Sequence, residues 1–323
     1  LPHTPFRCPR YGNTNKFHLK LSAFFSMAQK EKIAAVEKAK KQRRSSPWRD
    51  AGIRLRRNKA AMVGLAIIFL LLFCAFFPDV VAPYGYDDQD YSQSLQGPSA
   101  LHIMGTDSFG RDIFSRIVYG TRISLAIGFV SVIVSVIVGG ALGAWAAFYG
   151  KKTDTIIMRA IDILMAIPSL LLAISIAAAL GTGFVNMLFA ISIGGIPTYA
   201  RIVRASVLTV KEQEFVEAAR AIGASDRRLI LKHILPNVLA PIIVQATLGI
   251  AGGILSAASL SFLGLGIHPP TPEWGSMLSS GRQYIQSAWY IVTFPGLTIM
   301  LTIFALNLFG DGLRDALDPR LKR

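Results

Sequence analysis

Five long runs without a charged side chain constrain this chain of 323 residues more than any other feature. A membrane-spanning helix needs about 20 predominantly apolar residues, and about 18 is a practical lower limit. The runs that reach this limit are 60–78, 123–150, 163–200, 237–272 and 283–310. The third run is too long for one span and is interrupted by Gly181, Thr182 and Gly183, so the sequence predicts six transmembrane helices.

Composition separates a membrane protein from a large soluble one. A helix in the core of a soluble protein can also be apolar all round. Five such runs in one chain, with 52% hydrophobic and only 16% charged residues, are not typical of a soluble domain. We therefore predict an all-α integral membrane protein, in which the net charge of +15 is confined to loops and termini.

The distribution of basic residues predicts the orientation. All but four of the 34 lysines and arginines lie before the first predicted span, after the last one, or in alternate loops; the exceptions are Arg111, Arg116, Arg122 and Arg282. Loops rich in lysine and arginine stay in the cytoplasm. We therefore expect both termini, and a charged loop at about 205–236, to be cytoplasmic.

The N-terminal part of the chain divides at Met27. Residues 1–26 differ in character from the basic stretch after them, so we interpret them as a non-native or disordered leader, and we interpret 27–59 as a basic cytoplasmic segment. A cleaved signal peptide is the alternative, but cleavage would send the basic run outward. A basic run can bind nucleic acid, yet beside a membrane span it more often lies against anionic headgroups. We predict membrane lipids, and no nucleic acid, as its partner.

Residues 60–122 are predicted to form the first span and an external loop. Thr106 or Asp107 can cap a helix that leads into the second span, with one apolar face formed by Ile113, Phe114, Ile117 and Val118. The sequence by itself favours this simple role. The alternative is a docking surface for an external partner, for which the candidate residues are Asp107, Arg111 and Asp112.

The remaining part, 123–323, is predicted to be a core of five helices. Asp162 lies near the cytoplasmic end of the third span, one turn after Arg159, and Pro168 is expected to kink that helix. A local ion pair with Arg159 is the simpler interpretation of Asp162. A proton relay through Asp162 would instead make the chain a self-sufficient secondary transporter. Such folds usually have repeated halves, and the sequence has no convincing repeat.

No catalytic or metal-binding pattern is found in the sequence. The stretch GKKT at 150–153 lacks the preceding glycine of a phosphate-binding loop, and neither HExxH nor GxSxG occurs. Cys8 and Cys74 have no metal-ligand spacing and suggest no disulfide framework. We therefore expect a chain that is not an enzyme and holds no metal or cofactor of its own. The sequence leaves the substrate-binding residues unknown.

One charged segment, EFVEAARAIGASDRRLILKHILPN, lies between the fourth and fifth predicted spans. Its helical spacing predicts a short helix with Phe215, Ala218, Ala219 and Ile222 on one face, and Glu217 beside Arg220 as a possible ion pair. We expect Gly223 to break this helix, Ser225 or Asp226 to cap a second one over 227–235, and Pro236 to end it. From these residues alone, a passive linker beside the membrane and a compact protrusion that docks to a partner are equally good interpretations.

Part of that segment, EAARAIGASDRRLILKHILPN, resembles the EAA motif of ABC-importer permeases. The motif reads Glu-Ala-Ala, three residues, Gly, nine residues, and Ile-x-Leu-Pro. The residues that match its spacing are Glu217, Ala218, Ala219, Gly223, Leu235 and Pro236, whereas His233 stands where isoleucine is expected. The resemblance implies that this segment couples the permease to an ATP-hydrolysing subunit by fitting a groove on it.

The resemblance extends from about residue 46 to 323. The stretches SPWRDAGIRLRRNKAAMVGLA, MGTDSFGRDIFSRIVYGTRISL and LSFLGLGIHPPTPEWGSML resemble the C-type permease subunit of dipeptide and oligopeptide importers, a subgroup that includes nickel and glutathione systems. It implies a type I importer permease in a prokaryotic cell membrane that moves peptides inward. The implied partners are a B-type permease, two ATPases that bind ATP and Mg, and an extracellular or periplasmic substrate-binding protein.

Overall fold

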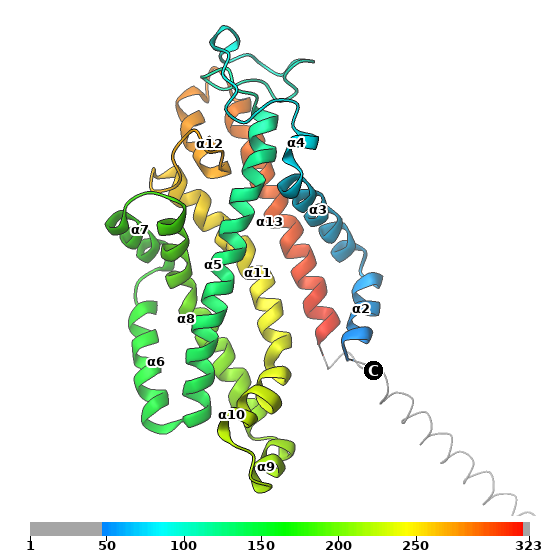
Figure 1. The fold of residues 1–323 in the computed structure, drawn as a ribbon, viewed down its shortest axis with the longest axis vertical. Coiled ribbons are helices and arrows are strands. Elements are labelled where there is room, and N and C mark those ends of the chain that lie inside the picture. The colour runs from blue at the N-terminus through cyan, green and yellow to red at the C-terminus, as the bar shows by residue number, and fades with distance from the viewer. Residues whose placement is uncertain (1–46, 319–323) are drawn as a thin grey trace, which may run out of the picture. The chain divides into compact units, whose positions relative to one another are not determined.

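The computed structural model describes residues 47–318, and the regular elements in that range are helices apart from one isolated bridge (Figure 1). The predicted leader 1–26, and the basic segment 27–59 up to residue 46, lie outside the described residues. The chain forms two compact units, 1–53 and 54–323. The described part of the first unit is the beginning of helix α2 (Pro47–Arg57), and all other elements belong to the second, larger unit. The predicted all-α fold is confirmed over the described range.

Four helices among residues 47–318 are long and apolar enough to cross a membrane. They are α3 (Lys59–Phe76), α5 (Ile113–Tyr149), the continuous stretch Asp226–Phe262 and α13 (Tyr290–Leu317). A fifth span results if α6 (Lys151–Met165) and α7 (Ser169–Leu180) are taken together across their 84° bend. One further long helix, α8 (Phe184–Lys211), is not among these candidate spans, and it carries Arg201 and Arg204 in its second half. The count of six spans therefore stays a prediction.

The run 163–200 differs from its predicted form. Its division at the glycines is confirmed, because α7 ends at Leu180 and α8 begins at Phe184. A single predicted helix over 163–180 is wrong, because the chain bends by 84° between α6 and α7. Pro168 immediately precedes α7, where its missing N–H group is not needed. The expected kink is thus a complete break.

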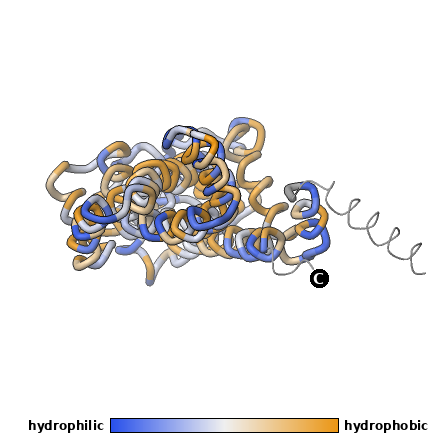
Figure 2. The backbone as a smooth tube through the Cα atoms, turned by 90° about the horizontal axis from the view of Figure 1, so that it is seen from below, coloured by the Kyte–Doolittle hydropathy of each residue, from blue (hydrophilic) through white to orange (hydrophobic). Residues whose placement is uncertain are grey.

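Helix α5 runs through the centre of the larger unit, beside α8, α11 (Leu235–Phe262) and α3 (Figure 1). Two glycines allow its close approach to α8. A Cβ atom built on Gly139 would lie 2.4 Å from the carbonyl oxygen of Ile196, and one built on Gly143 would lie 2.2 Å from that of Ala200. Small residues at a helix interface let backbones approach in this way. Seen from below, the tube is mostly hydrophobic, with hydrophilic stretches between the apolar ones (Figure 2).

At one end of this unit lie the short helices α4 (Pro78–Val81), η1 (Tyr91–Gln93), α12 (Trp274–Gly281) and η3 (Arg282–Tyr284). Glu273 caps α12 and is 1% exposed. Its carboxylate accepts hydrogen bonds from the backbone N–H groups of Gly275 at 2.8 Å and Ser276 at 2.7 Å. Burial raises the pKa of Glu273, and the two backbone donors oppose that rise. The adjacent Trp274 is fully buried and donates its indole N–H to the Ile117 carbonyl, which holds α12 against α5.

Candidate functional site

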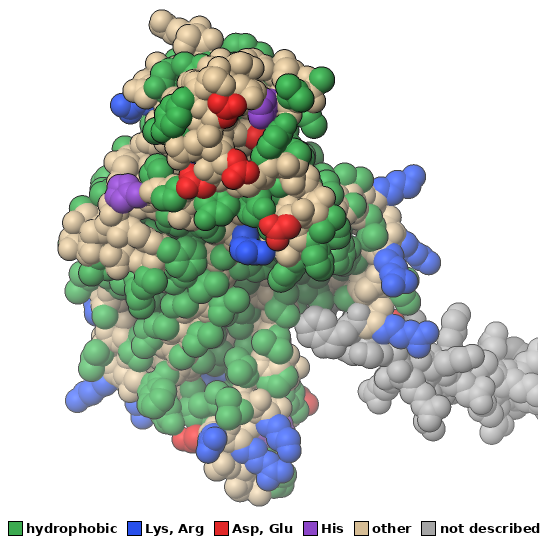
Figure 3. Space-filling model, turned by 45° about the horizontal axis from the view of Figure 1, so that its top comes forward, with side chains coloured by type: hydrophobic (Ala, Val, Ile, Leu, Met, Phe, Trp, Pro, Cys, Tyr) green, Lys and Arg blue, Asp and Glu red, His purple; other side chains and the backbone are tan. Residues whose placement is uncertain are grey.

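Two charged regions lie at opposite ends of the larger unit. The EAA segment, residues 214–236, lies at the lower end in Figure 1, and the outer loop, residues 82–112, lies at the upper end. In Figure 3, acidic side chains appear around the upper end, lysine and arginine side chains gather at the lower end, and hydrophobic side chains cover the surface between them. This separation is typical of a protein whose middle faces lipid.

Helix α9 (Glu214–Ala221) is held to the bundle by one face. Val216 is 1% exposed, and with Ala219 it belongs to a buried apolar cluster at this end. That cluster includes Phe148 at the end of α5, three valines of α8, and residues of α11; its members from α8 are Val203, Val207 and Val210. A displacement of α9 would therefore act on three long helices at once.

The opposite face of α9 is exposed. Phe215 is 40% and Ile222 is 87% exposed, and Ala218 lies exposed between them. The predicted shared face therefore holds for Phe215, Ala218 and Ile222, which are exposed, but not for Ala219, which is buried on the other face. An isoleucine that is almost fully exposed beside a phenylalanine is an apolar surface without a cover in the described chain.

Gly223 ends α9 as predicted. It has φ +83, in the left-handed region that side chains with a Cβ rarely adopt. The N–H of Ala224 donates to the Ala219 carbonyl, and the N–H of Gly223 donates to the Arg220 carbonyl. These two bonds satisfy the last carbonyls of the helix in a Schellman turn. No atom lies within 4 Å of a Cβ built on Gly223, so the need for glycine here comes from the backbone angle.

The predicted second helix exists only as the start of a longer one. Helix α10 (Asp226–Arg228) leads into a π-helical turn, η2 (Leu229–Ile234), and α11 follows without a gap. The prediction that Pro236 ends a separate helix is wrong. The wider turn before Pro236 gives room to a ring that would otherwise clash with the preceding turn. The EAA segment is thus joined rigidly to α11 and bends only at Gly223.

The predicted ion pair between Glu217 and Arg220 does not form among the described residues. The guanidinium of Arg220 instead lies over the Phe148 ring, 6.0 Å from its centroid. Lys211 donates to the Phe148 carbonyl at 2.6 Å, which further fixes the end of α5. Glu217 is exposed, with no partner in the described part of the chain. It is therefore free to contact another molecule.

The tip of the EAA segment is basic. A shallow hollow there is lined by Ser225, Arg227, Arg228, Leu231 and Lys232. Its three basic side chains are exposed, beside the apolar face of α9. This combination suits a partner groove that is apolar in the middle and acidic at its edge.

In the outer loop, the helix cap differs from the prediction. Asp112, rather than Thr106 or Asp107, caps α5, and its side chain accepts a hydrogen bond from the Ser115 backbone N–H. Thr106 forms a bridge with Asp112, so it holds the cap in place from the side. The expected apolar face is confirmed for Ile113, Ile117 and Val118, which are buried.

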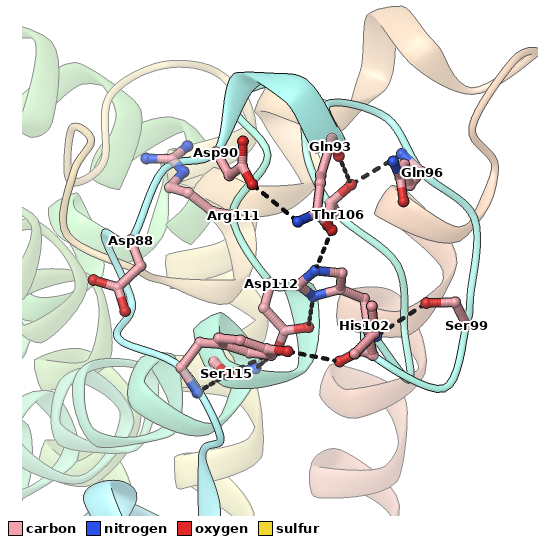
Figure 4. Close-up of polar contacts among 12 residues, drawn as sticks. Asp88, Asp90, Gln93, Gln96, Ser99, His102, Thr106, Arg111, Asp112 and Ser115 are labelled. Atoms are coloured by element: carbon pink, nitrogen blue, oxygen red, sulfur yellow. Dashed lines mark hydrogen bonds and ion pairs between the residues drawn. The ribbon is translucent and has the colours of Figure 1, made fainter.

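A buried histidine lies at the centre of this loop (Figure 4). The Nδ1 atom of His102 is 2.9 Å from Asp112 Oδ1, and its Nε2 atom is 3.0 Å from Gln93 Oε1. The Gln93 amide nitrogen donates to Asp90 at 2.9 Å, which leaves the amide oxygen facing the ring. Hydrogen bonds from the Ser92 hydroxyl and from Gln93 lower the pKa of Asp90. Both ring nitrogens of His102 thus lie within hydrogen-bond distance of side-chain oxygens, which fixes the ring at the centre of the loop.

The three candidate docking residues are mostly internal. Arg111 is 4% and Asp112 is 2% exposed. The Asp107 carboxylate lies 2.8 Å from Arg111 Nε and also accepts the Phe109 N–H. These side chains shape the loop. The exposed side chains beside them are the acidic residues of the loop, Asp87, Asp88 and Asp90, and three residues not expected from the sequence, Tyr91, Leu101 and Ile103.

Replacing Asp112 by alanine should loosen the outer loop. The variant loses the cap of α5 and the buried contact between Asp112 and His102, so we expect a destabilisation of about 1–3 kcal/mol. Asparagine also caps helices, so Asp112→Asn should cost less because only the charge is lost. Limited proteolysis and thermal unfolding of the detergent-solubilised protein measure both effects. Equal stability of all three proteins would contradict the role given to Asp112.

Asp162 has a different partner from the predicted one. Its carboxylate lies 2.6 Å from a guanidinium nitrogen of Arg201 on α8, and the predicted pair with Arg159 does not form among the described residues. Two helical turns away, Asp154 makes a bidentate ion pair with Arg204 at 2.5 and 2.6 Å. These pairs tie α6 to α8. Residues 47–318 contain no group of three or more His, Cys, Asp or Glu side chains that could hold a metal.

Comparison with protein families gives two matches. Residues 139–323 match the family described as the binding-protein-dependent transport system inner membrane component. Residues 46–98 match the N-terminal TM domain of oligopeptide transport permease C. Between the two ranges lie residues 99–138, which are the end of the outer loop and the first part of α5.

The similar proteins match this chain over almost their full lengths. The dipeptide transport system permease protein DppC of Alkalihalophilus pseudofirmus is 53% identical over 277 residues, which are 86% of this chain and 91% of that protein. The glutathione transport system permease protein GsiD of Escherichia coli O157:H7 is 45% identical over 299 residues, with shares of 92% and 99%. Among solved structures, an inward-facing methionine ABC transporter, MetNI, matches with a TM-score of 0.53 and 19% identity, covering 64% of this chain and 98% of that one. At that identity, the likeness concerns the fold alone.

Proposed function

This chain belongs to the binding-protein-dependent ABC permeases of the dipeptide and glutathione type, and we propose that it carries di- or oligopeptides into the cytoplasm. It is a multi-pass membrane protein, and the relatives named above are bacterial. As a C-type subunit it pairs with a B-type permease. Two ATPase subunits bind ATP and Mg and supply the energy, and an external binding protein delivers the peptide.

The observation that carries this proposal is the two-faced helix α9. Its buried face, with Val216 and Ala219, is part of the apolar cluster that joins α5, α8 and α11. Its exposed face, with Phe215 and Ile222, is left for a groove on the ATPase. When ATP binding moves that groove, α9 passes the displacement to the three long helices, which tilt and open the pathway outward.

The proposed orientation places the EAA segment inside the cell and the outer loop outside. We expect six spans, with α8 as one of them, and cytoplasmic termini. In a background without Cys8 and Cys74, a cysteine introduced by Asp88→Cys should react with an impermeant thiol reagent in intact cells. A cysteine introduced by Ser225→Cys should react only after the membrane is opened. Labelling of both, or of Ser225→Cys alone, in intact cells would contradict this orientation.

Glu217 tests the contact with the ATPase. It is exposed and unpaired within the described chain, so Glu217→Ala should change the free energy of unfolding by no more than about 0.5 kcal/mol. We expect peptide uptake to fall severalfold, because the carboxylate then no longer reaches a basic group of the partner. Uptake, co-purification of the ATPases and stimulated ATP hydrolysis are the measurements.

The matched control is Glu214→Ala. Both glutamates lie in the first turn of α9, so both variants lose the same favourable interaction with the helix dipole. Only Glu217 belongs to the matched motif, so Glu214→Ala should retain uptake. Equal uptake by both variants and the wild type would mean that Glu217 makes no functional contact.

A secondary transporter coupled through Asp162 is the rival function. Asp162 is paired with Arg201, and the two side chains are 47% and 49% exposed. A half-exposed carboxylate held by an arginine is suited to joining two helices, and a proton carrier would need to release that pair in each cycle. The ion pairs of Asp162 and Asp154 therefore favour a structural role for α6 in the permease.

A further inference from the structure

An open cavity of about 210 Å³ lies among the helices of the bundle. It is bounded by residues of α5, α7, α8 and α11. Non-helical backbone at membrane depth is tolerated where it is buried in protein or lines a cavity. Ser169, the first residue of α7, is part of the lining, so the break between α6 and α7 has a cavity beside it.

The lining is polar but uncharged. Hydroxyl and amide groups are contributed by all four helices, and in the described part of the chain no charged side chain lines the cavity. Four lining side chains make no hydrogen bond within the described residues: Ser169, Thr198, Gln245 and Ser256. Ser169 and Thr198 are exposed and Gln245 and Ser256 are half-buried, so these groups are available to water or to a bound molecule.

A buried tyrosine of the lining also has a polar group that is available to a ligand. Tyr199 lines the cavity and is only 4% exposed, yet the hydrogen bond from its hydroxyl to the Gln245 carbonyl is long, at 3.5 Å. Gly249 makes room for this hydroxyl, because a Cβ built there would lie 2.1 Å from it. The Tyr199 hydroxyl therefore has space at the cavity wall and only a weak partner, so it can form a hydrogen bond with a ligand.

We infer that this cavity contacts the transported peptide and recognises its backbone amide groups, an inference that rests on the proposed function. Hydroxyls and a carboxamide can each donate and accept, so they match the N–H and C=O groups that every peptide has. Without a charged side chain, the lining does not select among peptide side chains by charge. The site therefore suits passage of varied peptides rather than tight selection of one.

Gly252 offers a test that leaves the protein's own packing intact. It lines the cavity, and no atom lies within 4 Å of a Cβ built on it. Larger residues at 252 should therefore fill the cavity without a clash at the backbone. The measurement is uptake of a dipeptide and of a tripeptide by the complete importer in proteoliposomes. Gly252→Leu should reduce tripeptide uptake at least tenfold and dipeptide uptake less, and Gly252→Phe should reduce both.

Two variants separate this site from general effects. Leu255→Phe adds bulk to α11 at an exposed position outside the cavity and should keep wild-type uptake. Thr198→Val removes an unpaired hydroxyl from the lining and should raise KM, whereas Thr209→Val, on the same helix outside the lining, should not.

The outcomes distinguish the cavity from the overall function. Failure of the wild-type importer to take up peptide with ATP would refute the proposed function. If the wild type is active, unchanged uptake by Gly252→Phe would refute the inference that the cavity contacts the transported peptide. Loss of the second permease from purified Gly252→Leu would also refute it, because position 252 would then be a subunit contact.

Discussion

Gly223→Val is expected to lower peptide uptake at least about tenfold while all membrane helices remain inserted. The residue has φ +83, and a side chain with a Cβ in this region costs about 1–2 kcal/mol, which corresponds to roughly tenfold in an equilibrium. No atom lies near the built Cβ, so valine meets no obstacle within this chain. The strain would shift α9 relative to α10 and misplace the exposed face of Phe215 and Ile222. Uptake and co-purification of the ATPases would show the loss.

The control for this substitution is Gly223→Asn. Asparagine adopts positive φ more readily than other residues with a Cβ, so it should preserve the turn and most of the uptake. Loss of uptake in both variants, with intact folding, would mean that the partner approaches the backbone at Gly223 too closely for any side chain. Wild-type uptake and ATPase retention in Gly223→Val would contradict the role given to this turn.

The second large effect is expected at Gly143. A Cβ there would lie 2.2 Å from the Ala200 carbonyl oxygen and 3.1 Å from the Ala200 Cα atom, so α5 and α8 would have to separate. Overpacking of this kind usually costs about 1–3 kcal/mol. Because both helices also hold the cluster that supports α9, Gly143→Val should yield little folded protein and no assembled importer. Size-exclusion profiles in detergent and the amount of co-purified partner are the readouts.

Gly140→Val is the matched control for Gly143→Val. It introduces the same β-branched residue into the same helix, one turn earlier, with the same loss of helix propensity. Its Cβ would meet only the Val203 side chain, at an ordinary distance of 3.6 Å. The Gly140→Val protein should therefore assemble. If the two variants behave alike, helix propensity rather than the contact of α5 with α8 would explain the result.

The sequence predicted most of the features that depend on local pattern. The apolar runs marked α3, α5, the α11 stretch and α13, and the glycines at 181 and 183 separated α7 from α8. Gly223 was expected to end α9, and it does so at positive φ. These outcomes follow from the length of apolar runs and from the backbone freedom of glycine, both of which are properties of the chain itself.

The side chains' partners were not predictable in the same way. Asp162 pairs with Arg201, which lies 39 residues along the chain, rather than with Arg159 one turn away. Arg220 lies over Phe148 instead of beside Glu217. Such choices depend on which helices pack together, and helical spacing gives no information on that. The cap by Asp112 was missed for a similar reason, because Thr106 and Asp107 are equally good caps by residue type.

The cavity could not be found from the sequence at all. Its lining comes from four helices, and residues as ordinary as Ser169, Thr198 and Gln245 become notable only when the fold brings them together. Small and hydroxyl residues within apolar runs are read first as packing positions. Several of them do have that role, as Gly139 shows by its close approach to Ile196.

The central claim is that this chain moves peptide only when partner ATPases drive it through the EAA segment. The most direct measurement is accumulation of a labelled dipeptide in proteoliposomes, made with this chain alone and with the complete importer. We expect accumulation only by the complete importer, with the binding protein and ATP present, and its loss in Gly223→Val. Accumulation by the chain alone, driven by a proton or sodium gradient without ATP, would contradict the claim.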